Sequence, residues 1–135
     1  MEITNLTRQR IDKAFLKKIA GKAIAEIKSR KLQKISLVLV SKGRIREINK
    51  KYRHKNRPTD VLSFEGLNEI FICPEVVKIQ AKKLKTTFKN ELMRVLVHGI
   101  LHLAGFTHER NKVLARVMEK AEEKILGKIN GTTRK

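Results

Sequence analysis

The segment HGILHLAGFTH carries three histidines, His98, His102 and His108, in a stretch that is otherwise almost entirely apolar. On a helix, residues four apart differ by about 40° around the axis, so the rings of His98 and His102 lie on one face. Gly105 is a typical helix terminator, and a chain that turns back there brings His108 toward the same point. Three neutral imidazoles with an open fourth position are the ligand set of a catalytic zinc site. We therefore predict that the three histidines bind one Zn²⁺ per chain, or another divalent ion in its place.

Other roles for these groups were weighed against the metal. Three buried histidines whose ring nitrogens bond to backbone carbonyls are the simplest alternative. Cys73 as a fourth ligand would close the metal site, but we favour it as a small buried hydrophobe at the end of a strand. His54 lies among basic residues and is expected to be solvated.

The same histidine spacing occurs in the metzincin peptidases, whose pattern is H-E-x-x-H-x-x-G-x-x-H. Their general-base glutamate would stand at position 99, where this chain has Gly99. A peptidase without that carboxylate lacks its proton acceptor, and Glu109, beside the third histidine, is a weak substitute. A metallopeptidase is therefore the disfavoured alternative.

The net charge indicates a polyanionic partner. The 135 residues include 32 lysines and arginines against 13 acidic residues, a formal charge of +19. A surface that serves only solubility or heat resistance usually balances lysine with glutamate, and this one does not. Nucleic acid is the expected partner, bound through its phosphates. The absence of tryptophan and the single tyrosine argue against a base-stacking platform.

Length and composition predict one domain over residues 1–135, located in the cytoplasm and outside membranes. The length suits a single hydrophobic core. One cysteine forms no internal disulfide, which suits a reducing compartment. The sequence shows no signal-peptide core at its start and no apolar run of membrane-spanning length. Residues 127–135 are expected to fray.

Hydrophobic periodicity predicts four strands, over residues 2–7, 34–40, 59–64 and 69–73. Helices are expected over residues 9–30, from a cap at Ser41 through Tyr52, over 74–84, from a cap at Thr86 or Thr87 to Ala104, and over 109–126. The helix that ends at Ala104 is apolar almost all round, so it should be the buried central helix and carry the metal ligands. The expected fold class is α+β, a small mixed sheet of about four strands packed with about five helices.

These segments resemble the YbeY family of bacterial metal-dependent endoribonucleases. The family pattern H-G-x-L-H-L-x-G-[YF]-x-H is matched by residues 98–108, and the block Y-R-x-x-x-x-P-T-D-V-L-S-F by Tyr52, Arg53 and residues 58–64. A family L-G-D-I step corresponds to residues 67–70, and M-E-x-x-E-x-x-I-L is approximated by residues 118–126. The chain departs from the family at Thr107, where aspartate is usual, and at residues 68–69, where Asn-Glu replaces Gly-Asp.

The resemblance implies a single-strand-specific, metal-dependent endoribonuclease in the processing and maturation of ribosomal RNA and in ribosome quality control. The implied partners are RNA, above all small-subunit ribosomal RNA, and a small-subunit ribosomal protein. Arg53 is implied to be catalytic and to bind RNA, since a guanidinium grips phosphate with paired donors. Lys55 is expected to hold the RNA strand, and Glu69, in place of the family aspartate, to lie on the partner surface. Arg57 is interpreted as solvated, and Asp60 and Ser63 as turn and strand-packing residues.

In a third hypothesis the chain binds RNA and a metal ion but catalyses no reaction. In it the chain is a non-catalytic RNA- or ribosome-binding factor whose metal only stabilises the fold. The sequence does not separate this hypothesis from the nuclease.

Overall fold

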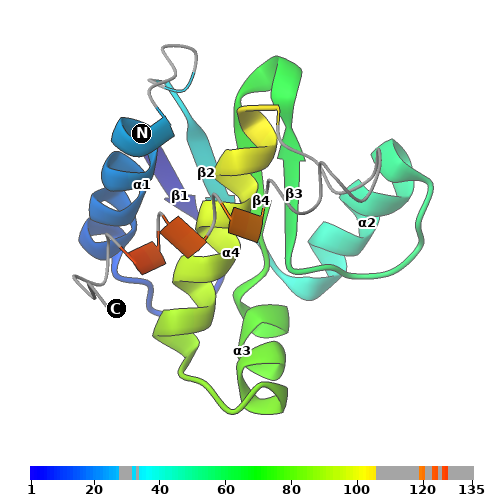
Figure 1. Cartoon of the computed structure of the whole chain (residues 1–135). Coiled ribbons are helices and arrows are strands. Elements are labelled where there is room, and N and C mark those ends of the chain that lie inside the picture. Colours follow the sequence, from blue (N-terminus) through cyan, green and yellow to red (C-terminus); the bar gives the residue numbers. More distant parts are fainter. Residues whose placement is uncertain (28–31, 33, 106–118, 121–122, 125, 128–135) are drawn as a thin grey trace.

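A four-stranded sheet with helices on both faces forms the body of the computed structural model, which describes residues 1–27, 32, 34–105, 119–120, 123–124 and 126–127 (Figure 1). In chain order its elements are β1 (Glu2–Asn5), α1 (Lys13–Ile27), β2 (Ser36–Leu39), α2 (Lys42–Arg53), β3 (Val61–Phe64), the 3₁₀ turn η2 (Glu65–Leu67), β4 (Glu69–Ile72), α3 (Pro74–Lys83) and α4 (Phe88–Leu103). The predicted α+β class is confirmed.

The sheet is mixed, with strand order β1-β2-β4-β3. β1 pairs parallel with β2, and β2 pairs parallel with β4. β3 runs antiparallel to β4, to which it is joined by η2. Among the described strands β3 therefore lies at an edge of the sheet.

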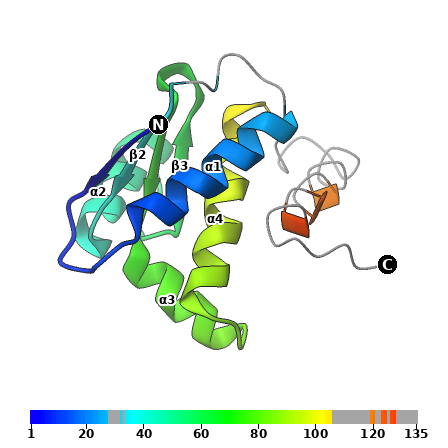
Figure 2. The ribbon, with the colours of Figure 1, turned by 90° about the vertical axis from the view of Figure 1, so that its left-hand side faces the viewer.

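The two faces of the sheet carry separate apolar clusters. Leu37 of β2 and Ile70 of β4, which are partners in register, face the large core formed with α1, α3 and α4. Their neighbours Val38 and Phe71 face the smaller cluster under α2. Figure 2 shows α1 and α4 on one side of the strands and α2 on the other. This alternation follows from the two-residue period of a strand.

All four predicted strands are present, each shorter than expected, whereas the first helix begins later than predicted. It begins at Lys13 instead of residue 9, because the carboxylate of Asp12 caps it by accepting from the amide of Phe15 at 3.0 Å. Before it, the side chains of Asn5 and Thr7 each accept from the backbone amide two residues further on. Such side-chain bonds favour a turn over a helix.

The predicted helix signals are confirmed where the structure describes them. The hydroxyl of Ser41 accepts from the Arg44 amide at 3.2 Å, and Thr87, not Thr86, caps α4 through the Asn90 amide at 3.0 Å. Pro74 occupies the first position of α3. Gly105 follows α4 with a φ of 99°, the left-handed conformation that glycine adopts without strain.

The number of helices differs from the prediction of about five. The continuous elements of the described residues include four α-helices and one 3₁₀ turn. The fifth predicted helix, residues 109–126, falls mostly outside the described residues, although Glu119, Lys120, Glu123, Lys124 and Leu126 are helical. The predicted fraying of residues 127–135 also lies outside, apart from Gly127.

α4 is the central helix, as predicted, and it packs tightly against the sheet at Gly99. Ten of its 16 residues are buried. A Cβ placed on Gly99 would lie 3.2 Å from side-chain atoms of Val61, Ser63 and Ile70. The hydroxyl of Ser63 donates to the Gly99 carbonyl at 3.0 Å. The position where a metzincin has its glutamate is therefore closed by the sheet in this fold.

Replacing Gly99 by glutamate should unfold the protein more easily. The side chain would be forced against β3 and β4 with a buried carboxylate, so we expect Gly99→Glu to lower the free energy of unfolding by roughly 3 kcal/mol. Gly21→Glu on α1 is the matched control, because a Cβ there meets nothing within 4 Å. It should leave stability unchanged or raise it slightly. Urea unfolding followed by circular dichroism measures both, and equal stability of the two variants would contradict this packing.

Candidate metal and nucleic-acid site

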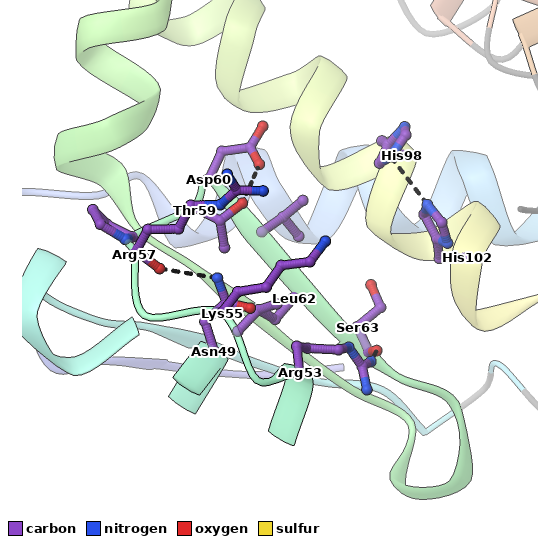
Figure 3. Close-up of a pocket in the computed structure, with 12 residues that line it drawn as sticks. Asn49, Arg53, Lys55, Arg57, Thr59, Asp60, Leu62, Ser63, His98 and His102 are labelled. Carbon is purple, nitrogen blue, oxygen red and sulfur yellow. Dashed lines mark hydrogen bonds between the residues drawn. The ribbon is translucent and has the colours of Figure 1, made fainter. Parts of the chain in front are cut away.

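A pocket of about 660 Å³ lies between α4, β3 and the loop that follows α2 (Figure 3). The loop is held by Asn49, a buried polar residue of α2 whose side chain donates to the Arg57 carbonyl at 2.9 Å. Its turn out of α2 uses His54 in the left-handed conformation, with φ 60°. The pocket lining includes Arg53, Lys55, Arg57, Ser63, His98 and His102.

The rings of His98 and His102 lie next to each other on the face of α4 that borders the pocket (Figure 3). Their Nε2 atoms are 3.1 Å apart, and their ring centroids are 4.6 Å apart. Two nitrogens bound at roughly 2.0–2.1 Å to one tetrahedral metal ion would be separated by about 3.3 Å. The pair therefore fits two ligands of a single ion with only a small adjustment.

The third predicted ligand, His108, lies outside the described residues. Within the part of the chain that the structure describes, no group of three or more histidine, cysteine, aspartate or glutamate side chains gathers to hold a metal. The three-histidine site therefore stays a prediction, of which the geometry supports two members. Gly105 ends α4 between those two and His108, as that prediction requires.

Cys73 belongs to the other side of the sheet. It is fully buried in the cluster under α2, with Ile45, Ile48 and Leu62, and it does not line the pocket. Burial raises the pKa of its thiol, and hydrogen bonds from the backbone near Val76 only partly oppose that effect. Its burial among apolar side chains, outside the pocket lining, makes it a packing group, as predicted.

Arg53 reaches the pocket from the last turn of α2. Its Nη2 donates to the carbonyl of Ser63 at 2.8 Å, and its guanidinium carbon lies 4.8 Å from the centroid of the Phe64 ring. Because a guanidinium has five N–H donors, this contact fixes the group without exhausting it. Ser63 thus contacts Arg53 through its carbonyl and α4 through its hydroxyl. The interpretation of Ser63 as a packing residue missed this double contact.

The remaining predicted residues differ in how close they lie to the pocket. Lys55 and Arg57 both line it, and Arg57 is exposed, as the interpretation of a solvated loop residue expects. Glu69 does not line it: it begins β4, in register with Ser36 on one side and Phe64 on the other. Its assignment to a partner surface stays a prediction.

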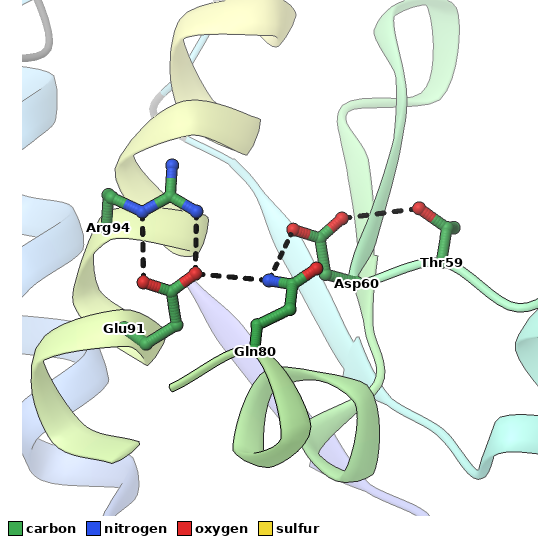
Figure 4. A network of polar contacts seen from close by, with 5 residues as sticks. All are labelled: Thr59, Asp60, Gln80, Glu91 and Arg94. Atoms are coloured by element: carbon green, nitrogen blue, oxygen red, sulfur yellow. Dashed lines mark hydrogen bonds and ion pairs between the residues drawn. The ribbon is translucent and has the colours of Figure 1, made fainter. Parts of the chain in front are cut away.

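A polar network that the sequence did not predict joins α3, α4 and the start of β3 (Figure 4). Glu91 is only 2% exposed, and Arg94 donates to both of its carboxylate oxygens, at 3.0 and 2.6 Å. The amide nitrogen of Gln80 donates to Glu91 and to Asp60, at 3.1 Å each. Asp60, which also accepts from Thr59, is therefore held in the pocket lining by α3. A charge buried in this way is tolerated because it is paired and fully hydrogen-bonded.

No helix among the described residues is long and apolar enough to span a membrane.

Comparisons with known proteins point to one family. A family model described as Endoribonuclease YbeY matches residues 2–130. Endoribonuclease YbeY of Sulfurihydrogenibium sp. (strain YO3AOP1) is 40% identical over 129 residues, which cover 88% of this chain and 84% of that protein. The protein of the same name from Thermodesulfovibrio yellowstonii is 38% identical and covers 92% of this chain and 94% of its own length. The solution structure of TM1509 from Thermotoga maritima is similar with a TM-score of 0.64 and 33% identity, over 96% of this chain and 89% of that one.

The metal prediction is tested by His102→Ala. Loss of one of two adjacent imidazoles should remove most of the bound metal, because a site with one ligand fewer binds far more weakly. His54→Asn is the matched control, since His54 is exposed, lies outside the pocket and has a left-handed backbone that asparagine tolerates. Metal per chain is measured by mass spectrometry after gel filtration. Full occupancy in His102→Ala would show that the site is misassigned.

Proposed function

Because this chain belongs to the YbeY family of endoribonucleases, we propose that it hydrolyses internal phosphodiester bonds of single-stranded RNA with a metal ion held by His98, His102 and His108. The observation that carries the proposal is the 3.1 Å separation of the His98 and His102 Nε2 atoms in a pocket that Arg53 and Lys55 also line. Convergent metal ligands beside cations are what a phosphodiester in a polyanion requires.

The residues of the chain have separable roles in this proposal. A divalent ion at the three histidines would lower the pKa of a bound water toward neutrality or polarise a phosphoryl oxygen. His98 and His102, whose Nε2 atoms lie 3.1 Å apart, would hold it as neutral imidazoles. Arg53, anchored by the Ser63 carbonyl, turns its remaining donors to the phosphate and stabilises the charge that develops on it. Lys55 holds the strand as a point charge.

The finer assignments are also proposals. The native metal is Zn²⁺, one per chain, and the substrate is ribosomal RNA of the small subunit, which the protein processes in the cytoplasm as a single domain over residues 1–135. Glu69 contacts a small-subunit ribosomal protein, and the activity serves ribosome quality control. The resemblance to the family supports these assignments, and the +19 charge supports a polyanionic substrate.

One experiment separates this function from its two alternatives. Pure protein is incubated with single-stranded RNA, with duplex RNA and with casein, each with and without a chelator. We expect cleavage of single-stranded RNA only, and its loss with the chelator. Cleavage of casein would favour the peptidase, which the closed space at Gly99 opposes. RNA binding without cleavage would favour the non-catalytic factor.

Arg53→Lys tests the role of the guanidinium. The variant keeps the charge and loses the planar fork, so the rate of RNA cleavage should fall by roughly ten- to a thousand-fold. RNA affinity should fall much less, because many other cations hold the strand. Arg8→Lys is the control, since it makes the same replacement at an exposed arginine outside the pocket.

Rates are measured in single-turnover assays and affinities by fluorescence anisotropy. Cleavage by Arg53→Lys at the parent rate would make Arg53 only part of the general basic surface. Equal losses of rate and affinity would assign it to ground-state binding.

A further inference from the structure

We propose that Tyr52 is a base-stacking subsite, on which an unpaired base stacks next to the nucleotide whose phosphate lies in the His98–His102 pocket. The inference rests on the proposed function and adds that the protein recognises an unpaired base of its RNA substrate.

Exposure alone does not single out Tyr52. Its side chain is 54% exposed at the end of α2, and Leu6, Leu67 and Leu84 are exposed to a similar or greater extent. Scattered exposed hydrophobic residues are normal on a protein surface. The difference lies in what holds the Tyr52 ring and in what surrounds it.

The ring of Tyr52 is held by a row of aromatic contacts. Its centroid lies 5.5 Å from that of Phe64, edge to face at 75°, and Phe64 lies 5.8 Å from Phe71 at 85°. Phe64 and Phe71 both pack against the cluster under α2, so the row ends in the core. A ring fixed in this way loses little conformational entropy when a base binds, which is the condition for a stacking site.

One cation contacts the exposed ring, and others line the groove beside it. Lys51 places its Nζ 5.3 Å from the ring centroid, and Tyr52 borders a groove of about 490 Å³ that Arg44, Lys50 and Lys51 also line. Residues 42–57 contain eight lysines and arginines, and their one carboxylate, Glu47, is paired with Arg44 at 3.4 Å. An aromatic ring in a cationic groove has the composition of a single-strand nucleic-acid site.

The groove and the metal pocket are lined by neighbouring residues at the end of α2, Tyr52 and Arg53. Arg53 follows Tyr52 in the chain, lines the metal pocket, and contacts the same Phe64 ring that supports Tyr52. A strand with one phosphate at Arg53 therefore has its neighbouring base beside Tyr52. Bases inside an A-form duplex are already stacked and paired, so only an unpaired strand can use this ring. The single tyrosine is too little for a platform of several bases, but it is enough for one.

The composition of the chain supplies a direct test. Tyr52 is the single tyrosine and the chain has no tryptophan, so its emission reports this ring alone. The full-length protein is titrated with a single-stranded RNA oligonucleotide, with the same strand carrying abasic sites, and with the duplex, at salt concentrations where all three bind. Free tyrosine corrects for absorbance by the nucleic acid, and electrophoresis of each sample measures how much of the strand is cleaved. We expect strong quenching by the normal single strand and little by the other two.

Equal quenching by all three ligands, or none by a bound single strand, overturns the subsite. Quenching without any cleavage would keep the subsite and count against the nuclease, so the two proposals fail separately.

Variants give a second, independent reading. Tyr52→Leu should bind the normal single strand about five- to a hundred-fold more weakly, the range for losing one stacked base, and the abasic strand almost unchanged. Tyr52→Phe should bind both like the parent, because it keeps the ring. Leu84→Ala is the control at an equally exposed site outside the groove. Equal weakening for normal and abasic strands in Tyr52→Leu, with folding intact by circular dichroism, overturns the proposal.

Discussion

The contact between Ser63 and Gly99 fixes the distance between the two halves of the pocket. The Ser63 hydroxyl donates to the Gly99 carbonyl, and the Ser63 carbonyl accepts from Arg53. One residue of β3 therefore contacts both the helix that carries His98 and His102 and the guanidinium of Arg53, which lines the same pocket. The absence of a side chain at Gly99 allows this approach, because a Cβ would already lie 3.2 Å from three neighbouring side chains. A metal-assisted hydrolysis tolerates little error in such distances.

The rest of the structure supports that arrangement from both ends of α4. At its start, the buried Glu91 is paired with Arg94 and joined through Gln80 to Asp60, which ties α4 to α3 and to the entry of β3. At its end, Gly105 follows the helix in a left-handed conformation. Between Glu91 and Gly105, His98 and His102 lie one helical turn apart and line the pocket. The cations stand on other elements, α2 and its loop, so charge and metal ligands are supplied independently.

Much of the fold and part of the site follow from local sequence signals. The β-branched run before Ser41, the caps at Ser41 and Thr87, and Pro74 each act within a few residues, so the sequence alone places those elements. The spacing of His98 and His102 is equally local, because helical geometry decides it. The third predicted ligand, His108, lies outside the residues that the structure describes, so it stays a prediction.

What the sequence does not reveal are contacts between distant elements. Glu91 looks like an ordinary first-turn acid, and only the packing of α3 shows that it is buried and bridged by Gln80. The support of Tyr52 by Phe64 and the double contact of Ser63 depend in the same way on the strand order. A count of one tyrosine therefore gave no sign that its ring is anchored beside a cationic groove.

The central claim is that His98 and His102 share one metal ion at the mouth of a cationic pocket. X-ray absorption at the zinc edge of the zinc-loaded protein tests it most directly, because it reports ligand type and distance at the ion itself. The account predicts nitrogen and oxygen neighbours only, at roughly 2.0–2.1 Å, with the outer-shell scattering of at least two imidazoles. A thiolate sulfur neighbour at roughly 2.3 Å would contradict it, and Cys73 is the single cysteine that could supply one. Scattering from fewer than two imidazoles would contradict it as well.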